Sequence, residues 1–443
     1  MSDPDPGLPG GFTGDVDVDV VVVGAGFAGL TVAGQLRAAG RTVVVLEARE
    51  RVGGKTESGT DHRGRRVDTG GRFANDDMTE VLALARAAGA ERVEAVHPGV
   101  PRTVPADLGG DPWADGEALL AGLGAAHLDD GRDVMQWVAD LGCPTTTREA
   151  VRSIVNGSTC ADSGSIPLSY LAQLNERSRT TNTELQLWFA TTMHALAEHL
   201  AAPLGGDVHL GCPARAVHVH ADCVEVVTLD RVWRAHHSVV AVPPTAYASL
   251  RFTPALPAVV ASAAASFAPG TVMKFLLHYD HPFWLEEGCN GTAQFVEPPG
   301  VYFADASLPG TAQLVGFVGG PTAADWSRHT QPQRRDAIVH HATLAFGPAA
   351  ETPDAVIERL WAPDEWGGGG YSNVQIQHAP HAADTLALGV PRVTFASTEL
   401  AVRFPGYVEG AIDAGRTAAA RVRTHLDLQY LAMPALGQEK DPR

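Results

Sequence analysis

The chain has few cysteines, a deficit of basic charge and no long hydrophobic run. Its 443 residues include five cysteines, none of them spaced as CxxC, so we expect neither a disulfide framework nor a cysteine zinc site, and we expect a reducing compartment. The net charge of −18 argues against nucleic acids and anionic membranes as partners, because both recruit basic patches. No stretch of about 18 apolar residues is present to span a bilayer.

The two ends of the sequence are expected to be tails. Residues 1–16 are acidic and rich in Pro and Gly, and they lack the basic start and the apolar stretch of a secretory signal. Residues 427–443 are too short and polar to anchor the chain. We therefore expect a soluble, cytoplasmic protein with a small-molecule partner. A homodimer is compatible with the sequence, which does not determine the oligomeric state.

A buried strand, a glycine turn and a helix follow the N-terminal tail. The run VDVVVV is typical of a parallel strand that is buried on both faces. In the next segment, GAGFAG, Gly24 permits a tight turn, Gly26 admits a pyrophosphate near the backbone, and Gly29 allows close packing of the helix. Glu47 ends a second buried strand, where it can accept hydrogen bonds from ribose hydroxyls. These elements predict a dinucleotide-binding βαβ unit, although GxGxxG alone would also fit an ordinary glycine-rich turn.

The order of the other elements predicts an α/β protein with two interleaved domains. Residues from about 78 to 205 read mostly as helix; β-rich blocks and a mixed region follow, and a strand, a polar turn and a helix come last. We assign residues 17–77, 205–250 and 390–426 to a nucleotide-binding domain, and residues 78–204 and 251–389 to a substrate-binding domain.

The segment LEARERVGGKTES after the second strand favours FAD over NAD. It resembles the FAD-binding signature of the flavin amine oxidase superfamily, which includes monoamine, polyamine and amino-acid oxidases. In that family a basic residue after the glycine pair, usually Arg, reaches the cofactor. Here it is Lys55, which keeps the positive charge but lacks the paired N–H donors of an arginine guanidinium. A solvated run of charges is the alternative interpretation of this segment.

FASTELAVRFPGYVEGAIDAG, near the C-terminus, is similar to the C-terminal FAD motif of the monoamine oxidase branch. The resemblance implies that Thr398 and Glu399 lie against the ribityl–phosphate portion of FAD. It also implies that a helix beginning near Val408 points its N-terminus at the isoalloxazine ring, where free N–H groups stabilise negative charge. Gly406 and Gly410 would allow the close approach.

The resemblance implies a fold and a set of cofactor contacts. The fold is a Rossmann-like (GR2-type) FAD-binding domain interleaved with an α+β substrate domain that has a mixed sheet and a helical section. Animal monoamine oxidases carry a cysteine that bonds to the flavin where this chain has Gly370, so we expect non-covalent FAD. The expected cofactor contacts are Gly24, Gly26, Phe27, Ala28, Gly29, Glu47, Ala48, Arg49, Gly54, Lys55, Gly70, Gly71, Arg72, Phe73, Ala214, Trp366, Thr398, Glu399, Gly406, Tyr407 and Val408.

Two tyrosines and a segment around Phe73 are expected to enclose the substrate. LWAPDEWGGGGYSNV matches the family segment that supplies Tyr371, which would form an aromatic cage with Tyr407. Such a slot excludes water and aligns the C–H bond that breaks. Either tyrosine taken alone is better explained by packing. In VDTGGRFANDD, Phe73 would form a wall, and Asn75 and Asp76 would contact a polar or cationic group.

Arg72 and Lys274 are two charged residues that the resemblance places near the substrate or the flavin. Several amino-acid oxidases bind carboxylate with an Arg at or next to the Phe73 position, and Arg72 keeps that possibility open. Lys274 lies in the apolar run TVMKFLLHYD, where a charge is costly, and taken alone it fits an edge-strand lysine that reaches solvent. The family's lysine in this segment bonds a water beside flavin N5 and assists the reaction with oxygen. Lys274 is therefore the first catalytic candidate.

The resemblance covers most of the chain, but it is weak between residues 78 and 205. There GGM, usual before a helix near residue 190, appears as FATTM. No metal site is expected, because His218 and His220 near Cys223 fit a solvent-facing hairpin.

The sequence predicts an FAD-dependent amine oxidase with Lys274, Tyr371 and Tyr407 as catalytic residues. The amine becomes an imine, which water hydrolyses to an aldehyde or ketone, while O2 is reduced to H2O2. Three alternatives stay open. One is an L-amino-acid oxidase or a tailoring enzyme of secondary metabolism that acts on a larger amine or amide. The others are a desaturase-like flavoprotein and a non-catalytic flavin-binding protein.

Overall fold

Strands from both ends of the chain share one sheet. The computed structural model describes residues 16–94, 98–178, 186–362 and 364–432. The sheet has eight strands in the order β12-β9-β10-β11-β1-β2-β8, with β20 paired to β11. β1 pairs in parallel with β2 and with β11, and β20 pairs in parallel with β11. Its strands are β1 (Val18–Val23), β2 (Val43–Leu46), β8 (Val208–His209), β9 (Ala216–Val219), β10 (Val224–Val227), β11 (Val232–Val240), β12 (Arg251–Thr253) and β20 (Val393–Phe395).

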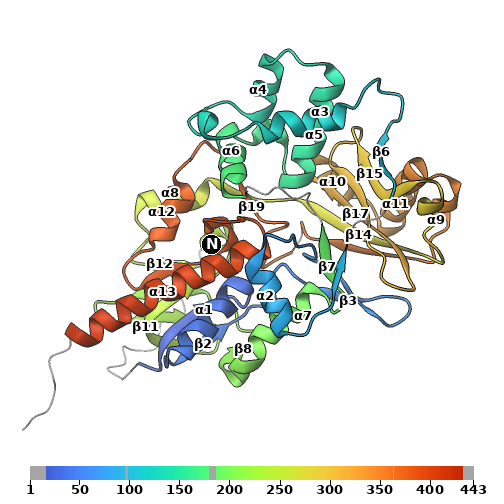
Figure 1. The fold of residues 1–443 in the computed structure, drawn as a ribbon. Helices are drawn as coiled ribbons and strands as arrows, with labels where there is room; N and C mark the ends of the chain where they lie inside the picture. The colour runs from blue at the N-terminus through green and yellow to red at the C-terminus, as the bar shows by residue number, and fades with distance from the viewer. Residues whose placement is uncertain (1–15, 95–97, 179–185, 363, 433–443) are drawn as a thin grey trace, which may run out of the picture.

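Two helices from opposite ends of the sequence pack together beside this sheet. α1 (Phe27–Ala38) and α13 (Val408–Ala432) lie side by side (Figure 1). α13 begins at Val408, as the C-terminal motif predicts, but it continues to Ala432, past the expected boundary at residue 426. β12 likewise extends the sheet past residue 250, because it pairs with β9. Residues 1–15 and 433–443 of the two expected tails fall outside the described ranges.

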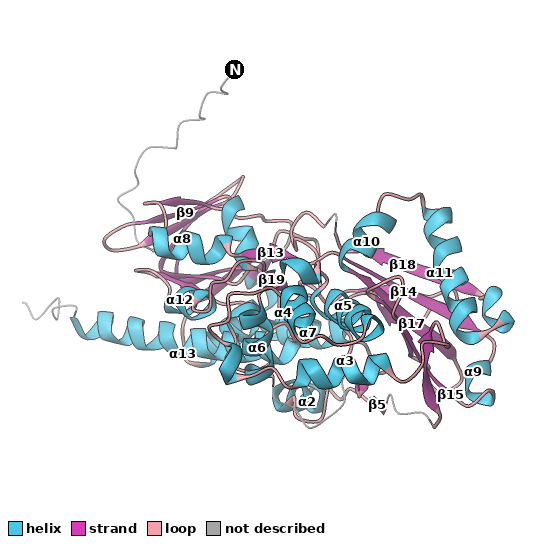
Figure 2. Ribbon diagram, turned by 90° about the horizontal axis from the view of Figure 1, so that it is seen from above, coloured by secondary structure: helices cyan, strands magenta, loops and turns pink. Residues whose placement is uncertain are grey.

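A second sheet has six strands in the order β18-β14-β17-β16-β15-β6. β14 and β17 are buried along their whole length, and α10 (Gly320–Trp326) and α11 (Gln331–Phe346) flank the sheet (Figure 2). β6 lies in the region that we expected to be mostly helical. It is a strand because its backbone pairs with β15. The strands are β6 (Val100–Val104), β14 (Val272–Tyr279), β15 (Cys289–Phe295), β16 (Val301–Asp305), β17 (Ala312–Gly319) and β18 (Ala355–Leu360).

A helical section lies above both sheets in Figure 1 and between them in Figure 2. It consists of α3 (Pro112–Ala121), α4 (Val134–Asp140), α5 (Thr145–Thr159) and α6 (Leu168–Arg177). Three two-stranded sheets lie apart from the two large sheets. They pair β3 (Ser58–Thr60) with β4 (Arg66–Asp68), β5 (Arg92–Glu94) with β7 (Leu187–Phe189), and β13 (Phe267–Pro269) with β19 (Asn373–Gln375). The other helices are α2 (Thr79–Ala87), α7 (Met193–Ala201), α8 (Ala258–Ala265), α9 (Phe283–Glu286) and α12 (Ala382–Leu388). Within the described ranges, none of the helices has the length and apolar character needed to cross a membrane.

Candidate active site

The glycine turn between β1 and α1 has the geometry of a dinucleotide-binding site. Glu47 is buried at the end of β2, and its carboxylate accepts from Ala25 N at 2.7 Å and from Arg49 N at 2.9 Å. A Cβ at Gly29 would come within 2.0 Å of Gly24 O, so glycine is required for the helix to pack this closely. The sequence predicts this role for Gly29. The turn therefore presents free N–H groups at the start of α1.

A cavity of about 1660 Å³ lies next to this turn. This volume exceeds the ~300–1,000 Å³ of pockets that hold one small ligand, so a dinucleotide and a substrate both have room. Residues from both ends of the chain line the cavity, together with parts of the second sheet and of the helical section. Every predicted cofactor contact lies in its wall except Gly29, which packs beneath the turn.

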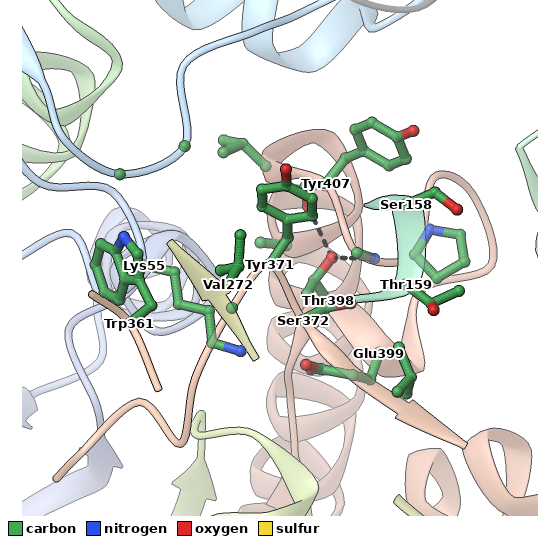
Figure 3. A pocket seen from close by; sticks show the side chains of 18 of the residues that line it. Lys55, Ser158, Thr159, Val272, Trp361, Tyr371, Ser372, Thr398, Glu399 and Tyr407 are labelled. Carbon is green, nitrogen blue, oxygen red and sulfur yellow. Dashed lines mark hydrogen bonds between the residues drawn. The ribbon is translucent and has the colours of Figure 1, made fainter. Parts of the chain in front are cut away.

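The C-terminal motif folds into a turn held by Thr398. Thr398 Oγ1 donates to Tyr407 O at 2.7 Å and accepts from Gly406 N at 2.9 Å (Figure 3). The Thr398 hydroxyl is thus engaged by its own turn, although the residue still lines the cavity. Glu399 accepts from Asn373 N at 2.8 Å and connects this turn to the segment that carries Tyr371.

Lys55 and Glu399 provide a test of whether the cavity fits a cofactor. The two side chains point toward one another in Figure 3. Lys55 Nζ and Glu399 Oε2 are closed to solvent, and neither has a hydrogen-bond partner among the described residues. Burial lowers the pKa of Lys55, and the negative charge of Glu399 opposes this change. Buried polar atoms without partners are rare in folded proteins, so this pair indicates where a polar ligand belongs. The residues present therefore fit a cofactor that offers both a hydrogen-bond acceptor, for Lys55, and a donor, for Glu399.

Lys274 is buried in the middle of β14, with 3% of its surface exposed. β14 lies between β17 and β18, so the edge-strand alternative is wrong. Lys274 Nζ donates to Gly70 O at 2.7 Å, and burial is the main reason that the pKa of Lys274 falls to about 7. The whole sequence contains three lysines, Lys55, Lys274 and Lys440. The two in the described residues both line the cavity.

Aromatic side chains surround the part of the cavity near Lys274. Tyr371 and Tyr407 both line it and stand beside one another in Figure 3. Phe317 packs edge-on against Tyr371, with ring centroids 5.7 Å apart. Phe73 lies 6.3 Å from Phe317 by the same measure and also lines the wall. The structure therefore brings the two predicted tyrosines and Phe73 to the same cavity.

The polar residues expected beside the substrate have different positions. Asn75 is buried and lines the cavity. Asp76 does not: it is exposed outside the wall, and its carboxylate pairs with Arg92 at 2.6 Å. The expectation that Asp76 contacts substrate is corrected accordingly. Arg72 lines the cavity but donates through Nη1 to Gln313 and through Nη2 to Ala306 O, both at 3.0 Å.

The helical section contributes wall residues that no motif indicated. α3 and α5 pack against each other at Gly116, where an added Cβ would lie 3.2 Å from Ile154 Cδ1. Both helices bring apolar and polar side chains to the cavity. A periodic apolar pattern predicts that such helices are buried but not what they face. The residues that sequence reasoning missed include Trp113, Glu117, Leu120, Ile154, Ser158, Thr159 and Tyr170.

The described residues contain one group with metal-ligand chemistry, formed by Asp61, His62 and His278. Its ligand atoms lie within 4.8 Å of one another. Asp61 already accepts from Arg63 N and Arg65 N and from Arg65 Nε. The group is therefore better explained as a hydrogen-bonded turn beside arginine than as a cation site. His218 and His220 lie near Glu225, but only His220 is exposed, so the expectation that this hairpin faces solvent is wrong for the buried His218.

The parallel strands around β1, the glycine turn and the cavity are those of a protein that binds a nucleotide cofactor. The chain belongs to the flavin containing amine oxidoreductase family, whose model matches residues 27–423. It is thus a flavin-dependent oxidoreductase that acts on small-molecule amines, as the sequence predicts.

Known relatives match nearly the whole chain. "Amine oxidase [flavin-containing] B" of Homo sapiens is 28% identical, and the match covers 91% of this chain and 86% of that protein. An L-amino acid dehydrogenase of Synechocystis is 25% identical over 91% of this chain and 94% of that protein. The structure of cyclohexylamine oxidase from Brevibacterium oxydans has a TM-score of 0.86 at 28% identity, covering 93% of this chain and 100% of that one. A putrescine oxidase structure, 23% identical, shares the fold, with a TM-score of 0.84 and coverage of 92% and 99%.

Proposed function

We propose that this protein is an FAD-dependent amine oxidase that holds its cofactor without a covalent bond. It oxidises a C–N bond of an amine to an imine, which water hydrolyses to an aldehyde or ketone, while O2 is reduced to H2O2. The observation that carries the proposal is that the glycine turn, Tyr371, Tyr407 and Lys274 all line one cavity. When bound, FAD supplies the acceptor for the hydride that the amine loses and passes the electrons to oxygen.

The residues of the chain have distinct tasks in this reaction. Tyr371 and Tyr407 hold the amine between them and exclude water. Removal of water disfavours the ammonium form, so the substrate reacts as a neutral amine without a strong general base. Lys274 presents a positive charge where oxygen gains electrons, which stabilises the developing negative charge. Lys55 and the N-terminus of α13 would hold polar parts of the cofactor.

The contacts of Arg72 favour an amine over an amino acid. A carboxylate is held most firmly by two parallel N–H groups of one guanidinium. Both terminal nitrogens of Arg72 already donate to protein acceptors at 3.0 Å. An L-amino-acid oxidase is the second candidate, because Arg72 lines the cavity and one relative carries the name L-amino acid dehydrogenase.

Anaerobic titration of the purified protein tests the proposal. We expect a yellow protein whose flavin absorption bleaches when an amine is added, recovers when air is admitted, and releases H2O2. Bleaching by amino acids alone would support the second candidate, and no bleaching across amines, amino acids and amides would overturn both. Acid precipitation should leave a colourless pellet and a yellow supernatant, whereas a yellow pellet would contradict non-covalent binding.

A further inference from the structure

A single carboxylate ties a turn in the cavity wall to the nucleotide-binding part of the chain. The turn, residues 364–367, follows β18, and three of its residues line the cavity: Glu365, Trp366 and Gly367. Asp364 accepts a hydrogen bond from Arg49 Nη2, although 315 residues of sequence separate the two. Arg49 follows β2 and lines the same cavity. The ion pair therefore connects two segments of the wall that are far apart in the sequence.

The Asp364 carboxylate also shapes the turn. Its Oδ1 accepts from Gly367 N at 2.6 Å and from Trp366 N at 3.2 Å, and its Oδ2 accepts from Arg359 Nη2 at 3.1 Å. The side chain is 8% exposed. Hydrogen bonds to a charged acceptor are stronger than those to a neutral one, and exclusion of water strengthens them further. Asp364 is therefore the point at which the turn and both arginines meet.

Both arginines are held independently of the turn. Arg359 lies on β18, where its Nε donates to Glu57 Oε1 at 2.7 Å and its guanidinium carbon lies 4.3 Å from the ring centroid of Trp361. Arg49 is fixed through its backbone, since its N–H donates to the Glu47 carboxylate at 2.9 Å. The two guanidinium groups therefore form a frame on which the turn docks.

The turn also packs closely on the nucleotide-binding domain. A Cβ at Gly367 would come within 2.8 Å of Arg49 Nη2. Arg215, which precedes β9, has its guanidinium carbon 5.7 Å from the ring centroid of Trp366. Arg49 and Trp366 are both expected cofactor contacts, so the position of the turn bears on how the cofactor is held.

We propose that Asp364 is a positioning residue for the cofactor: it holds residues 364–367 against Arg49 and thereby slows the release of FAD. The proposal rests on the proposed function for the identity of the cofactor and for its non-covalent binding. Asp364 is not among the described residues that line the cavity, so it acts through the turn and through Arg49.

The direction of the effect separates positioning from simple charge. Removal of the Asp364 charge leaves Arg49 with an uncompensated positive charge, which would attract the phosphates of FAD more strongly. Charge alone therefore predicts slower release of FAD. Positioning predicts faster release, because the turn loses its attachment to both arginines.

Release of FAD from the flavin-loaded protein is measured after dilution, as a rise in flavin fluorescence, with a phosphodiesterase present to cleave free FAD and prevent rebinding. We expect Asp364→Asn to release FAD about 10-fold faster or more, the effect of losing hydrogen bonds to a charged group. Asp364→Ser, whose hydroxyl can still accept from Gly367 N, is the second variant if the amide variant does not fold. In an Arg49→Met background, Asp364→Asn should accelerate release much less, because the partner is already missing.

Glu358→Gln is the matched control. Glu358 also lies on β18, is 12% exposed and pairs with Arg334 at 2.5 Å, but neither residue is among the described residues that line the cavity. Its loss should lower the stability of the apoprotein in urea and leave the release of FAD unchanged. Unchanged or slower release from the Asp364 variants, or equal acceleration in Glu358→Gln, would overturn the proposal and leave the proposed function standing. A wild-type protein that takes up no FAD, or that never releases it, would overturn both this proposal and the non-covalent binding of the proposed function.

Discussion

The Glu409 carboxylate of α13 accepts a hydrogen bond from Val81 N of α2 at 2.9 Å, across 328 residues of sequence. The same carboxylate accepts from Glu80 N at 3.0 and 3.1 Å. Glu409 therefore satisfies N–H groups in the first turn of α2 from the first turn of α13. α13 brings Val408 and Ala411 to the cavity wall, and Met78, which precedes α2, also lines it, so this bond connects two segments next to the cavity.

Replacement of Glu409 should loosen that connection. We expect Glu409→Ala to lower the free energy of unfolding by about 1–3 kcal/mol, because buried donors lose a charged acceptor. Urea unfolding measures this change. Asp413→Ala, one turn further along α13, is the control, since the described residues give Asp413 no hydrogen bond or ion pair. Equal losses in the two variants would contradict the role of Glu409.

The reaction with oxygen should depend on pH through Lys274. Burial lowers the pKa of Lys274 to about 7, so the protonated form is present below this pH and is lost as the pH rises through it. The rate of flavin reoxidation should therefore fall as the pH rises through 7. Lys274→Met should slow reoxidation on the order of 10²-fold at pH 6 and remove this dependence, with little effect on reduction by amine. Stopped-flow absorbance separates the two half-reactions, and equal reoxidation in both proteins would exclude the role.

Tyr371 should act through its ring. Tyr371→Ala is expected to lower kcat/KM by about 10- to 100-fold, because the amine loses one side of its slot and is held less precisely for reaction. Tyr371→Phe keeps the ring and the contact with Phe317, so it should retain most of the activity. If the Phe variant is as impaired as the Ala variant, the hydroxyl and not the ring is responsible.

Two glycines of α1 offer a matched pair of substitutions. A Cβ at Gly29 would meet Gly24 O at 2.0 Å, whereas a Cβ at Gly34 would meet nothing within 4 Å. Gly29→Ala should therefore distort the turn and reduce the flavin content of the purified protein. Gly34→Ala should retain flavin and raise the free energy of unfolding by about 0.5–1 kcal/mol, since glycine is unfavourable inside a helix. Normal flavin content in Gly29→Ala would contradict the packing argument.

Thr192 occupies a backbone conformation that suits glycine. It lies in the segment FATTM, where the family resemblance led us to expect GGM, and its φ is 81°. A β-branched residue is strained there, while its hydroxyl accepts from Ala195 N at 3.3 Å as a helix cap. Thr192→Gly should raise the free energy of unfolding by about 1 kcal/mol, because relief of strain outweighs the cap. Thr330→Gly is the control: Thr330 caps α11 with a φ of −68°, so that variant should lose stability in thermal unfolding.

Local motifs allowed much of the site to be predicted from sequence. The glycine turn, Glu47 and the start of α13 at Val408 follow from spacing within short segments, and the structure confirms their geometry. The environment of Lys274 did not follow, since β14 owes its interior position to β17 and β18, which come later in the chain. Asp76 was misplaced for a similar reason, because its partner Arg92 lies on β5, a strand that comes later in the chain.

The helical section was less predictable still. Its helices form because their apolar residues recur with helical spacing, but the surface that each presents to the cavity depends on how α3 packs on α5. No local sequence pattern shows that Trp113 and Ile154 line the cavity and are not ordinary core residues. The part of the site that selects the substrate therefore needed the structure.

The location of the lysines has a consequence for the durability of the protein. Carbonyl compounds condense readily with exposed primary amines, and the reaction proposed above would generate such compounds with every turnover. Among the described residues, both lysines line the cavity, and the basic side chains on the outside are arginine guanidinium groups and histidine imidazoles. Under the proposed function, an aldehyde product that leaves the cavity would therefore meet few groups on the described exterior with which it could form Schiff bases.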